Sequence, residues 1–274
     1  MINLICPVCG CELNKIGNSL KCDKNHSFDI ARQGYVNLLM SNKSSLKHHG
    51  DDKLMVKARS DFFEKGYYAP LREGVISAVM KQAKKNVCVL DSGCGDCWYT
   101  EGVYKALGDA GMNPTVMGID ISKDALIAGR KQCRELTLCV ASASKLPVKT
   151  ESADIVLNIF SPLEADEYSR VLKKDGVLIR AVPMEKHLWS LKQAVYDKPY
   201  ENPPVDTALN GFELVDTIEV RERIKLTSTE DIQNLFKMTP YYYKTGVKDQ
   251  YKLTELDYLE TELEVMILSY CPIK

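Results

Sequence analysis

The sequence has no run of about 18 consecutive apolar residues, which a membrane-spanning helix requires. Its N-terminus also lacks the basic segment and following apolar segment of a secretory signal peptide. The 274 residues carry a net charge of only −1 at pH 7, with 45% apolar and 27% charged residues. A chain of this length and composition has enough apolar residues for one ordinary core and a small additional module. We therefore expect a globular, cytoplasmic protein.

A disulfide framework is not expected, although the chain contains ten cysteines. Half of them stand singly among apolar neighbours, as buried free thiols do: Cys88, Cys94, Cys133, Cys139 and Cys271. The other five include a cluster within the first 22 residues. These clustered cysteines are the ones whose spacing suggests a binding or redox site.

The N-terminal cluster has the spacing of a zinc site, C-x2-C-x12-C-x3-H, formed by Cys6, Cys9, Cys22 and His26. Zn²⁺ takes four sulfur or nitrogen ligands in a tetrahedron, and two short knuckles supply them when the segment between them folds back as a hairpin. Gly17 and Asn18 suit that turn. Four protein ligands indicate structural zinc, with Cys11 pointing away. A redox-active Cys-x-x-Cys or unbound thiols are the alternatives.

Charge is distributed unevenly along the chain. The first 60 residues contain nine Lys and Arg against five Asp and Glu, so they carry +4 and the remainder carries −5. A cationic head on an acidic body favours a polyanionic partner, and an ordinary solvated face is the alternative. The polar stretch 41–53 is expected to be a loop, in which His48 and His49 are either solvated or additional metal ligands.

From residue 87 onward, short apolar runs alternate with helical patterns. Strands are expected within 87–92, 115–122, 136–142, 153–162 and 176–183, with helices beginning near residues 98 and 123. Strands separated by helices are typical of an α/β fold with a doubly wound parallel sheet. A ligand then binds at the carboxyl ends of the strands.

The turn after the first of these strands reads D-S-G-C-G-D-C from Asp91 to Cys97, which is not the dinucleotide-binding G-x-G-x-x-G. It resembles the D-x-G-x-G-x-G turn of class I S-adenosylmethionine-dependent methyltransferases, with Cys97 in place of the third glycine. The resemblance implies a Rossmann-like seven-stranded sheet. It also implies cofactor contacts in the turn, at the end of the second strand and in the adenine segment "ASASKLPV": Asp91, Gly93, Gly95, Asp120, Ser142 and Ala143.

Head and body together are similar to the bacterial 23S rRNA (guanine-N1-)-methyltransferase family, which combines an N-terminal zinc module with a class I catalytic domain. The resemblance spans nearly the whole chain and rests on "CPVCGCEL…CDKNHSFDIARQGYVNLL", "GDDKLMVKARSDFFEKGYYAPLR", "DSGCGDCWYT", "PMEKHLWSLKQAVYD" and "LFKMTPYYYK". It implies S-adenosylmethionine and zinc as cofactors, a guanine in a 23S rRNA hairpin as substrate, and a possible homodimer. It further implies cofactor contacts at Tyr68, Asp96, Cys97, Trp98 and His187.

On this basis, residues 1–40 are expected to form a zinc-binding RNA-recognition module. Residues 41–85 then form a linker and helices that join the domains, and residues 86–274 form the methyltransferase domain. Two other functions stay open. One is a small-molecule methyltransferase of the quinone or sterol type, and the other is a non-catalytic RNA-binding protein in which Cys97 has spoiled the cofactor site.

The sequence does not identify a catalytic base. Guanine N1 must lose its proton while the methyl sulfonium lies in line with it, so positioning carries much of the rate. Asn158 and Ser161 in "NIFSP" are candidates for orienting the guanine edge, against a plain polar turn. Tyr241 and Tyr243 are candidates for stacking on the base, against ordinary surface packing. Glu164, Asp166 and Glu167 are candidates for the base by their charge, but they are expected to open a helix and interact with its dipole.

Overall fold

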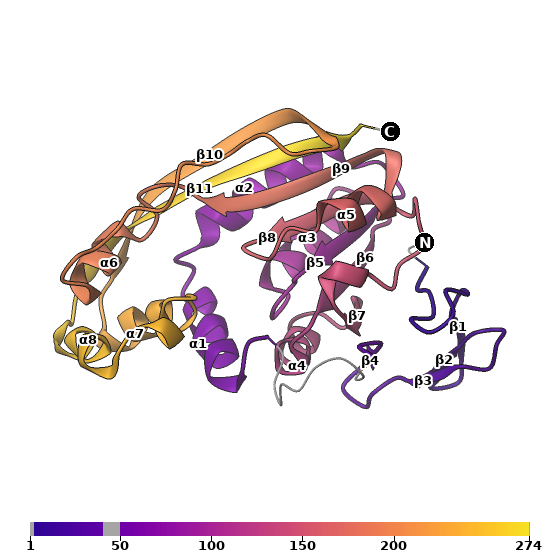
Figure 1. Cartoon of the computed structure of the whole chain (residues 1–274), viewed down its shortest axis with the longest axis horizontal. Coiled ribbons are helices and arrows are strands. Elements are labelled where there is room, and N and C mark those ends of the chain that lie inside the picture. The colour runs from indigo at the N-terminus through magenta and orange to yellow at the C-terminus, as the bar shows by residue number, and fades with distance from the viewer. Residues whose placement is uncertain (1–2, 41–49, 274) are drawn as a thin grey trace.

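The computed structural model describes residues 3–40 and 50–273, so His48 and His49 lie outside the described residues. An eight-stranded mixed sheet forms the centre of the molecule, in the order β10-β11-β9-β8-β5-β6-β7-β4 (Figure 1). The strands are β4 (Tyr35–Asn37), β5 (Cys88–Ser92), β6 (Thr115–Asp120), β7 (Thr137–Val140), β8 (Ala153–Ile159), β9 (Leu172–Pro183), β10 (Phe212–Leu226) and β11 (Leu259–Pro272).

The predicted doubly wound sheet is confirmed. β5 to β9 coincide with the five apolar runs and pair in parallel, while β10 and β11 add an antiparallel hairpin against β9. The helices α3 (Trp98–Asp109), α4 (Lys123–Gln132) and α5 (Ala165–Val171) follow β5, β6 and β8. The seven strands that the resemblance implies are β5 to β11. The eighth, β4, comes from the N-terminal segment and pairs in parallel with β7.

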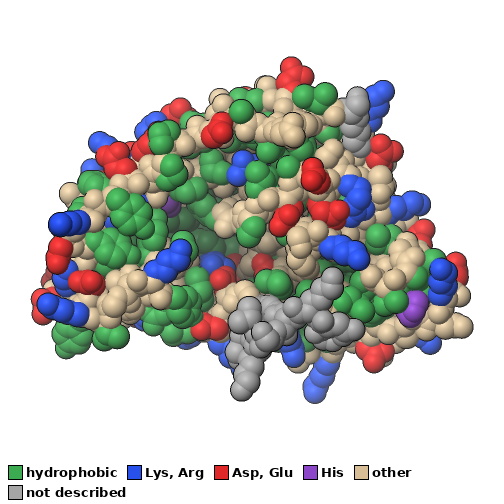
Figure 2. Space-filling model, viewed as in Figure 1, with side chains coloured by type: hydrophobic (Ala, Val, Ile, Leu, Met, Phe, Trp, Pro, Cys, Tyr) green, Lys and Arg blue, Asp and Glu red, His purple; other side chains and the backbone are tan. Residues whose placement is uncertain are grey.

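The remaining helices lie against the sheet and around the carboxyl ends of its strands. They are α1 (Lys53–Glu64), α2 (Ala69–Gln82), α6 (Trp189–Val195), α7 (Thr229–Lys237) and α8 (Val247–Tyr251), with short 3₁₀ turns η2 (Ala143–Lys145), η3 (Tyr242–Lys244) and η4 (Lys252–Glu255). Figure 2 shows a hollow, lined largely by hydrophobic side chains, between β8 on one side and α1, α6 and α7 on the other. Among the described residues, no helix combines the length and apolar content needed to cross a membrane.

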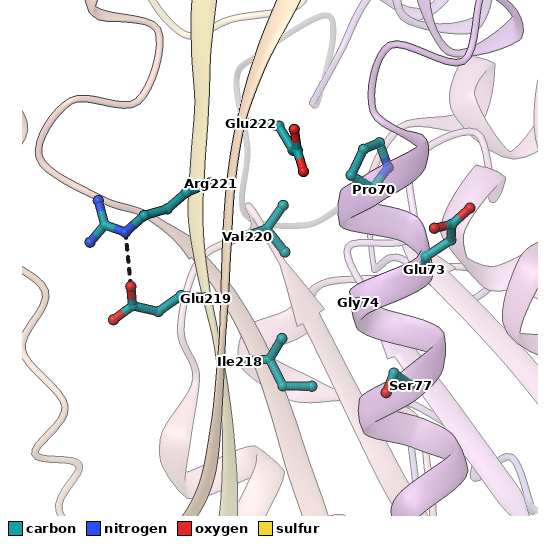
Figure 3. A pocket seen from close by; sticks show the side chains of 9 residues that line it. All are labelled: Pro70, Glu73, Gly74, Ser77, Ile218, Glu219, Val220, Arg221 and Glu222. Carbon is teal, nitrogen blue, oxygen red and sulfur yellow. Dashed lines mark hydrogen bonds and ion pairs between the residues drawn. The ribbon is translucent and has the colours of Figure 1, made fainter.

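A second groove, of about 470 Å³, lies between α2 and the edge strand β10 (Figure 3). Gly74 is the reason that α2 packs so close to the sheet, since a Cβ there would lie 2.8 Å from Ile267 Cδ1. Glu219 and Arg221 form an ion pair on the outer side of β10. Charged side chains on an edge strand oppose pairing with other strands. None of the residues that line this groove belongs to the predicted site.

The N-terminal module is a small antiparallel sheet of β1 (Asn14–Ile16), β2 (Ser19–Lys21) and β3 (Ser27–Asp29). Its β1–β2 hairpin has the predicted turn at Gly17 and Asn18, where Gly17 adopts a φ of 60°. The module is attached to the body, because the Ile5 amide donates to the Pro147 carbonyl (2.9 Å) and the Lys149 amide to the Asn3 carbonyl (3.0 Å). The head therefore contacts the end of the segment predicted to border the adenine.

Candidate zinc centre and cofactor site

The four predicted zinc ligands converge in the N-terminal module. Their ligand atoms all lie within 4.8 Å of one another. His26 Nδ1 is 3.5 Å from Cys6 Sγ and 3.3 Å from Cys22 Sγ, and the sulfurs of Cys9 and Cys22 are 3.7 Å apart. Zn–S bonds of about 2.3 Å and Zn–N bonds of about 2.0 Å place tetrahedral ligands about 3.5–3.8 Å apart. The residues present therefore fit a tetrahedral zinc ion.

The first knuckle owes its shape to Gly10. Its φ of 74° is unfavourable for other residues, and it lets the Gly10 amide donate to the Cys6 carbonyl (2.8 Å). A hydrogen bond from the backbone at Cys11 lowers the pKa of the Cys9 thiol to about 7, which favours the thiolate. Cys11 itself stands outside the four-residue cluster, as the sequence predicts.

The glycine turn after β5 has the backbone that its resemblance to the methyltransferases implies. Gly93, Gly95 and Cys97 have φ values of 85°, 55° and 62°, all in the left-handed region that favours glycine. A Cβ on Gly93 would collide with Ser161, so the turn and the loop after β8 touch at this point. Cys97 adopts the strained conformation at the N-terminal end of α3, which explains why a glycine is usual there.

The side chain of Cys97 fills a space that another glycine leaves. Its sulfur is 3.7 Å from Cys94 Sγ and is fully buried. A Cβ on Gly129 of α4 would lie 2.5 Å from Cys97 Sγ, and one on Gly118 of β6 would lie 2.8 Å from Cys94 Sγ. The two thiols thus pack between the turn, β6 and α4. The cysteine replaces the third glycine, and its thiol donates to the Gly95 carbonyl of the same turn (4.0 Å).

Asp91 and Asp120 end neighbouring strands and differ in how their oxygens are used. Asp91 Oδ2 accepts from Thr100 Oγ1 (2.6 Å), whereas its buried Oδ1 has no hydrogen-bond partner among the described residues. Burial raises the pKa of Asp91 to about 7. Asp120 accepts from the amides of Gly95 (2.9 Å) and Ser122 (2.7 Å), and burial raises its pKa. An unpaired, buried carboxylate oxygen beside a glycine turn fits the ammonium of a methionyl group.

The adenine segment begins directly after β7. The Ala141 amide donates to the carbonyl of Asp120 (3.1 Å), which holds this segment beside the end of β6. Ser142 caps the 3₁₀ turn η2 through its hydroxyl, and Ala143 is the first residue of that turn. Both are half-buried. The segment thus lies next to Asp120 at the end of β6.

Three predicted cofactor contacts belong to one series of aromatic rings. Trp98 stacks on Phe63 of α1 (centroids 4.5 Å apart), Phe63 contacts Tyr68 (5.8 Å), and Tyr68 meets His187 edge-on (6.3 Å). Burial lowers the pKa of His187 to about 3, and the charge of Lys192 acts in the same direction. His187 Nδ1 accepts from the Glu264 amide (3.3 Å), so the ring is neutral with its hydrogen on Nε2.

Helix α1 contributes two residues that the sequence reasoning missed, since residues 41–85 were interpreted as a linker and joining helices. Ser60 Oγ donates to Asp96 Oδ2 (2.7 Å). Arg59 forms an ion pair with Asp51, and its guanidinium lies 3.3 Å from where a Cβ on Gly95 would be. Arg59 also opposes the burial that raises the pKa values of Asp96 and Asp120. α1 therefore packs against the glycine turn that is the candidate cofactor site.

Asn158 and Ser161 lie together at the end of β8, with their side chains 2.5 Å apart. Asn158 Nδ2 also donates to Tyr168 Oη (3.1 Å) and to the Pro162 carbonyl (3.0 Å), while Ser161 Oγ donates to the Ser92 carbonyl (2.7 Å). These bonds fix the loop after β8 against the end of β5. Both side chains already have partners within the protein.

The acidic and tyrosine candidates each have contacts of their own. Glu164 stands at the N-cap position of α5 but makes no capping hydrogen bond with its side chain, and Asp166 and Glu167 stand in the first turn, as predicted. Tyr243 is exposed and donates to Asp52 (2.5 Å). Tyr241 lies over the ammonium of Lys192 (5.1 Å). Lys192 is buried, and burial lowers its pKa. The sequence does not predict this buried position, because an isolated lysine on a helix carries no local signal.

Comparisons with known proteins agree with this geometry. Residues 4–46 match a family model described as the N-terminal region of RlmA, with a zinc ribbon, and residues 89–176 match a methyltransferase domain. The structure of the YcgJ protein from Bacillus subtilis superposes with a TM-score of 0.51 at 12% identity, over 74% of this chain and 99% of that one. The chain is thus a class I S-adenosylmethionine-dependent methyltransferase with an N-terminal zinc module.

Sequence relatives define the family. A protein of Bacillus subtilis (strain 168) with the name "Putative 23S rRNA (guanine-N(1)-)-methyltransferase YxjB" is 31% identical over 96% of this chain and 95% of its own length. The 23S rRNA (guanine(748)-N(1))-methyltransferase of Streptomyces fradiae is 32% identical over 70% of this chain and 67% of its own length. This chain belongs to the 23S rRNA (guanine-N1-)-methyltransferase family.

Proposed function

We propose that this protein transfers the methyl group of S-adenosylmethionine to N1 of a guanine in a stem-loop of 23S rRNA. One observation carries the proposal: the chain contains both a zinc-type Cys3His cluster and a class I cofactor turn, and the segment 141–148 connects the two parts of the molecule. The head contacts this segment through Pro147, and Asp120 contacts it through Ala141. RNA bound by the head is thereby presented to the reaction site.

We assign the zinc ion to Cys6, Cys9, Cys22 and His26, where it has a structural role because four protein ligands leave no open position. In the cofactor site, Asp91 Oδ1 holds the methionyl ammonium, and Gly93 and Gly95 allow the backbone to approach it. Asp120 binds the ribose hydroxyls. Ser142 and Ala143 border the adenine.

The remaining cofactor contacts come from the series of aromatic rings and from the adjoining turn: Tyr68, Asp96, Cys97, Trp98 and His187. The cofactor supplies an electrophilic methyl group when bound. His187 is a hydrogen-bond donor through Nε2 and not a base, because its pKa of about 3 makes it too weak to accept the N1 proton. The guanine must leave its stack to reach this site.

The lysines of the N-terminal module are assigned to the phosphate backbone of the hairpin, since Lys and Arg contacts to phosphates position nucleic acids without reading sequence. Lys15 and Lys21 belong to the β1–β2 hairpin, and Lys24 follows it. The location is proposed to be the cytoplasm, where ribosomal RNA is modified. A homodimer is part of the proposal as well, and sedimentation of the purified protein at several concentrations measures it.

The test is to incubate the protein with labelled S-adenosylmethionine and unmodified 23S rRNA, and to locate the label by primer extension. Methylated N1 cannot form a Watson–Crick pair, so reverse transcription is expected to stop next to a single hairpin guanine. The same RNA without S-adenosylmethionine is the control. Label that appears only in small molecules would favour the quinone or sterol type of methyltransferase, and absence of cofactor binding in calorimetry would favour a non-catalytic RNA-binding protein.

A further inference from the structure

Phe160, at the end of β8, combines two features that are unusual for a phenylalanine. Its side chain is 44% exposed, although nearly all of the strand before it is buried. Its φ is 51°, in the left-handed region that a bulky residue rarely adopts. The conformation is maintained by its neighbours, since the Phe160 amide donates to the Ala181 carbonyl (3.2 Å) and Ser161 is fixed to β5. Backbone strain that the surroundings enforce is concentrated at functional sites.

The ring of Phe160 extends the aromatic series of the cofactor site. It stacks on His187, with ring centroids 5.8 Å apart and planes inclined by 24°. The series therefore runs from Trp98 through Phe63, Tyr68 and His187 to Phe160. The first four side chains are at most 8% exposed, so Phe160 is the member that reaches solvent.

The position of Phe160 relative to the cofactor turn is also defined. Ser161, its neighbour, touches the place where a Cβ on Gly93 would lie, so the loop after β8 crosses the glycine turn. The carboxyl ends of β5 and β8 meet there, which is where ligands bind in open α/β sheets. Phe160 thus presents an exposed aromatic ring beside the end of β5, where the glycine turn begins.

We propose that Phe160 is the stacking platform for the extruded guanine, with His187 behind its ring to fix the orientation. This inference rests on the proposed function and deepens it by naming a base-positioning residue. Base–aromatic stacking needs only a π face on each partner. Asn158 and Ser161 then act indirectly, because their hydrogen bonds hold the loop that carries Phe160.

The test compares Phe160→Ala, Phe160→Leu and Phe160→Tyr in the methylation of unmodified 23S rRNA. Loss of the stacked ring is expected to lower kcat/KM for RNA about 10- to 100-fold in Phe160→Ala and at least about fivefold in Phe160→Leu, which keeps the apolar volume without the π face. Phe160→Tyr is expected to stay within about threefold of the wild type. Leu214→Ala is the matched control, since Leu214 is a similarly exposed apolar residue at the far end of β10.

Two further measurements separate stacking from a structural role. S-adenosylmethionine affinity in calorimetry and the melting temperature are expected to be unchanged in all variants. If Phe160→Ala lowers cofactor affinity as much as it lowers methylation, the ring supports His187 and the stacking proposal is wrong. If Phe160→Ala methylates RNA normally, the proposal is also wrong, but the proposed function stands. If the wild-type protein leaves the guanine unmethylated, the proposed function fails, and this inference fails with it.

Discussion

The sequence Cys-x-x-Cys occurs twice in this chain, as Cys6–Cys9 in the N-terminal module and as Cys94–Cys97 in the turn after β5. In the module the sulfurs approach two further ligands, and His26 Nδ1 comes within 3.5 Å of Cys6 Sγ. In the turn, the sulfurs of Cys94 and Cys97 are also 3.7 Å apart. They lie against Gly118 of β6 and Gly129 of α4 instead of against further ligands.

The difference between the two pairs lies in their surroundings and not in their spacing. A backbone hydrogen bond lowers the pKa of Cys9 to about 7, whereas burial raises the pKa of Cys94. A thiolate is a metal ligand, and a buried thiol behaves as a small apolar group. The first pair therefore suits metal coordination, and the second pair serves packing. Three experiments test this contrast.

The largest effect is expected from Cys22→Ser, which removes one of the four ligands. Structural zinc supplies about 10–16 kcal/mol of folding free energy in small modules, so the variant should lose the metal and at least about 99% of its RNA methylation. Cofactor affinity should be largely retained, because Asp91, Asp120 and the glycine turn belong to the body. Metal analysis, the methylation assay and calorimetry measure these three quantities.

Cys11→Ser is the control for this experiment, since Cys11 stands next to the first knuckle without joining the cluster. It should keep one zinc ion per chain and near-normal methylation. A Cys11→Ser variant without zinc, or a Cys22→Ser variant that keeps it, would show that the ligands have been assigned incorrectly. Equal loss of cofactor affinity and methylation in Cys22→Ser would mean that the whole fold depends on the head.

The second effect concerns the packing of Cys97 against α4. Gly129→Ala would place a Cβ 2.5 Å from Cys97 Sγ, and such overpacking costs about 1–3 kcal/mol of unfolding free energy. Cys97→Gly removes the obstructing sulfur and relieves the left-handed strain at φ 62°. The double variant should therefore be more stable than Gly129→Ala alone. Denaturant unfolding of the four proteins gives the coupling energy.

Gly108→Ala serves as the matched control for Gly129→Ala, because a Cβ at Gly108 of α3 meets no atom within 4 Å. It should not be destabilising. Strictly additive free energies in the Cys97 and Gly129 cycle would contradict the inferred contact. Packing against Gly129 of α4 would then not offset the strain that Cys97 introduces in place of the third glycine.

The sequence predicts the zinc ligands and the strands well because both depend on local signals, namely ligand spacing and runs of apolar residues. The contact between Cys97 and Gly129 depends on how α4 approaches the turn, which no local pattern encodes. The same holds for Arg59 and Ser60, which lie on a helix 36 residues before the residues of the turn that they contact. The sequence does not predict the exposure and the strained backbone of Phe160, because this residue follows a buried strand in an apolar run.

The smallest effect is the pH dependence of cofactor binding, which should depend on Asp91 and not on the neighbouring thiols. Burial raises the pKa of Asp91 to about 7 in the free protein, so the folded state keeps a proton that the unfolded state loses near pH 4. Stability of the free protein should therefore fall as the pH rises from about 4 to 7 and change little above that range.

Binding of S-adenosylhomocysteine reverses this preference, since its ammonium would pair with the unpartnered Oδ1 and favour the ionised carboxylate. Its affinity should be about eightfold weaker at pH 6.0 than at pH 7.5, from a single group with a pKa of about 7. Calorimetry at the two pH values measures the ratio. Asp91→Asn should bind more weakly with no such ratio, and Cys94→Ala should keep it. If Cys94→Ala abolished the pH dependence, the second thiol pair would have a titrating role, and the contrast with the zinc knuckle would no longer hold.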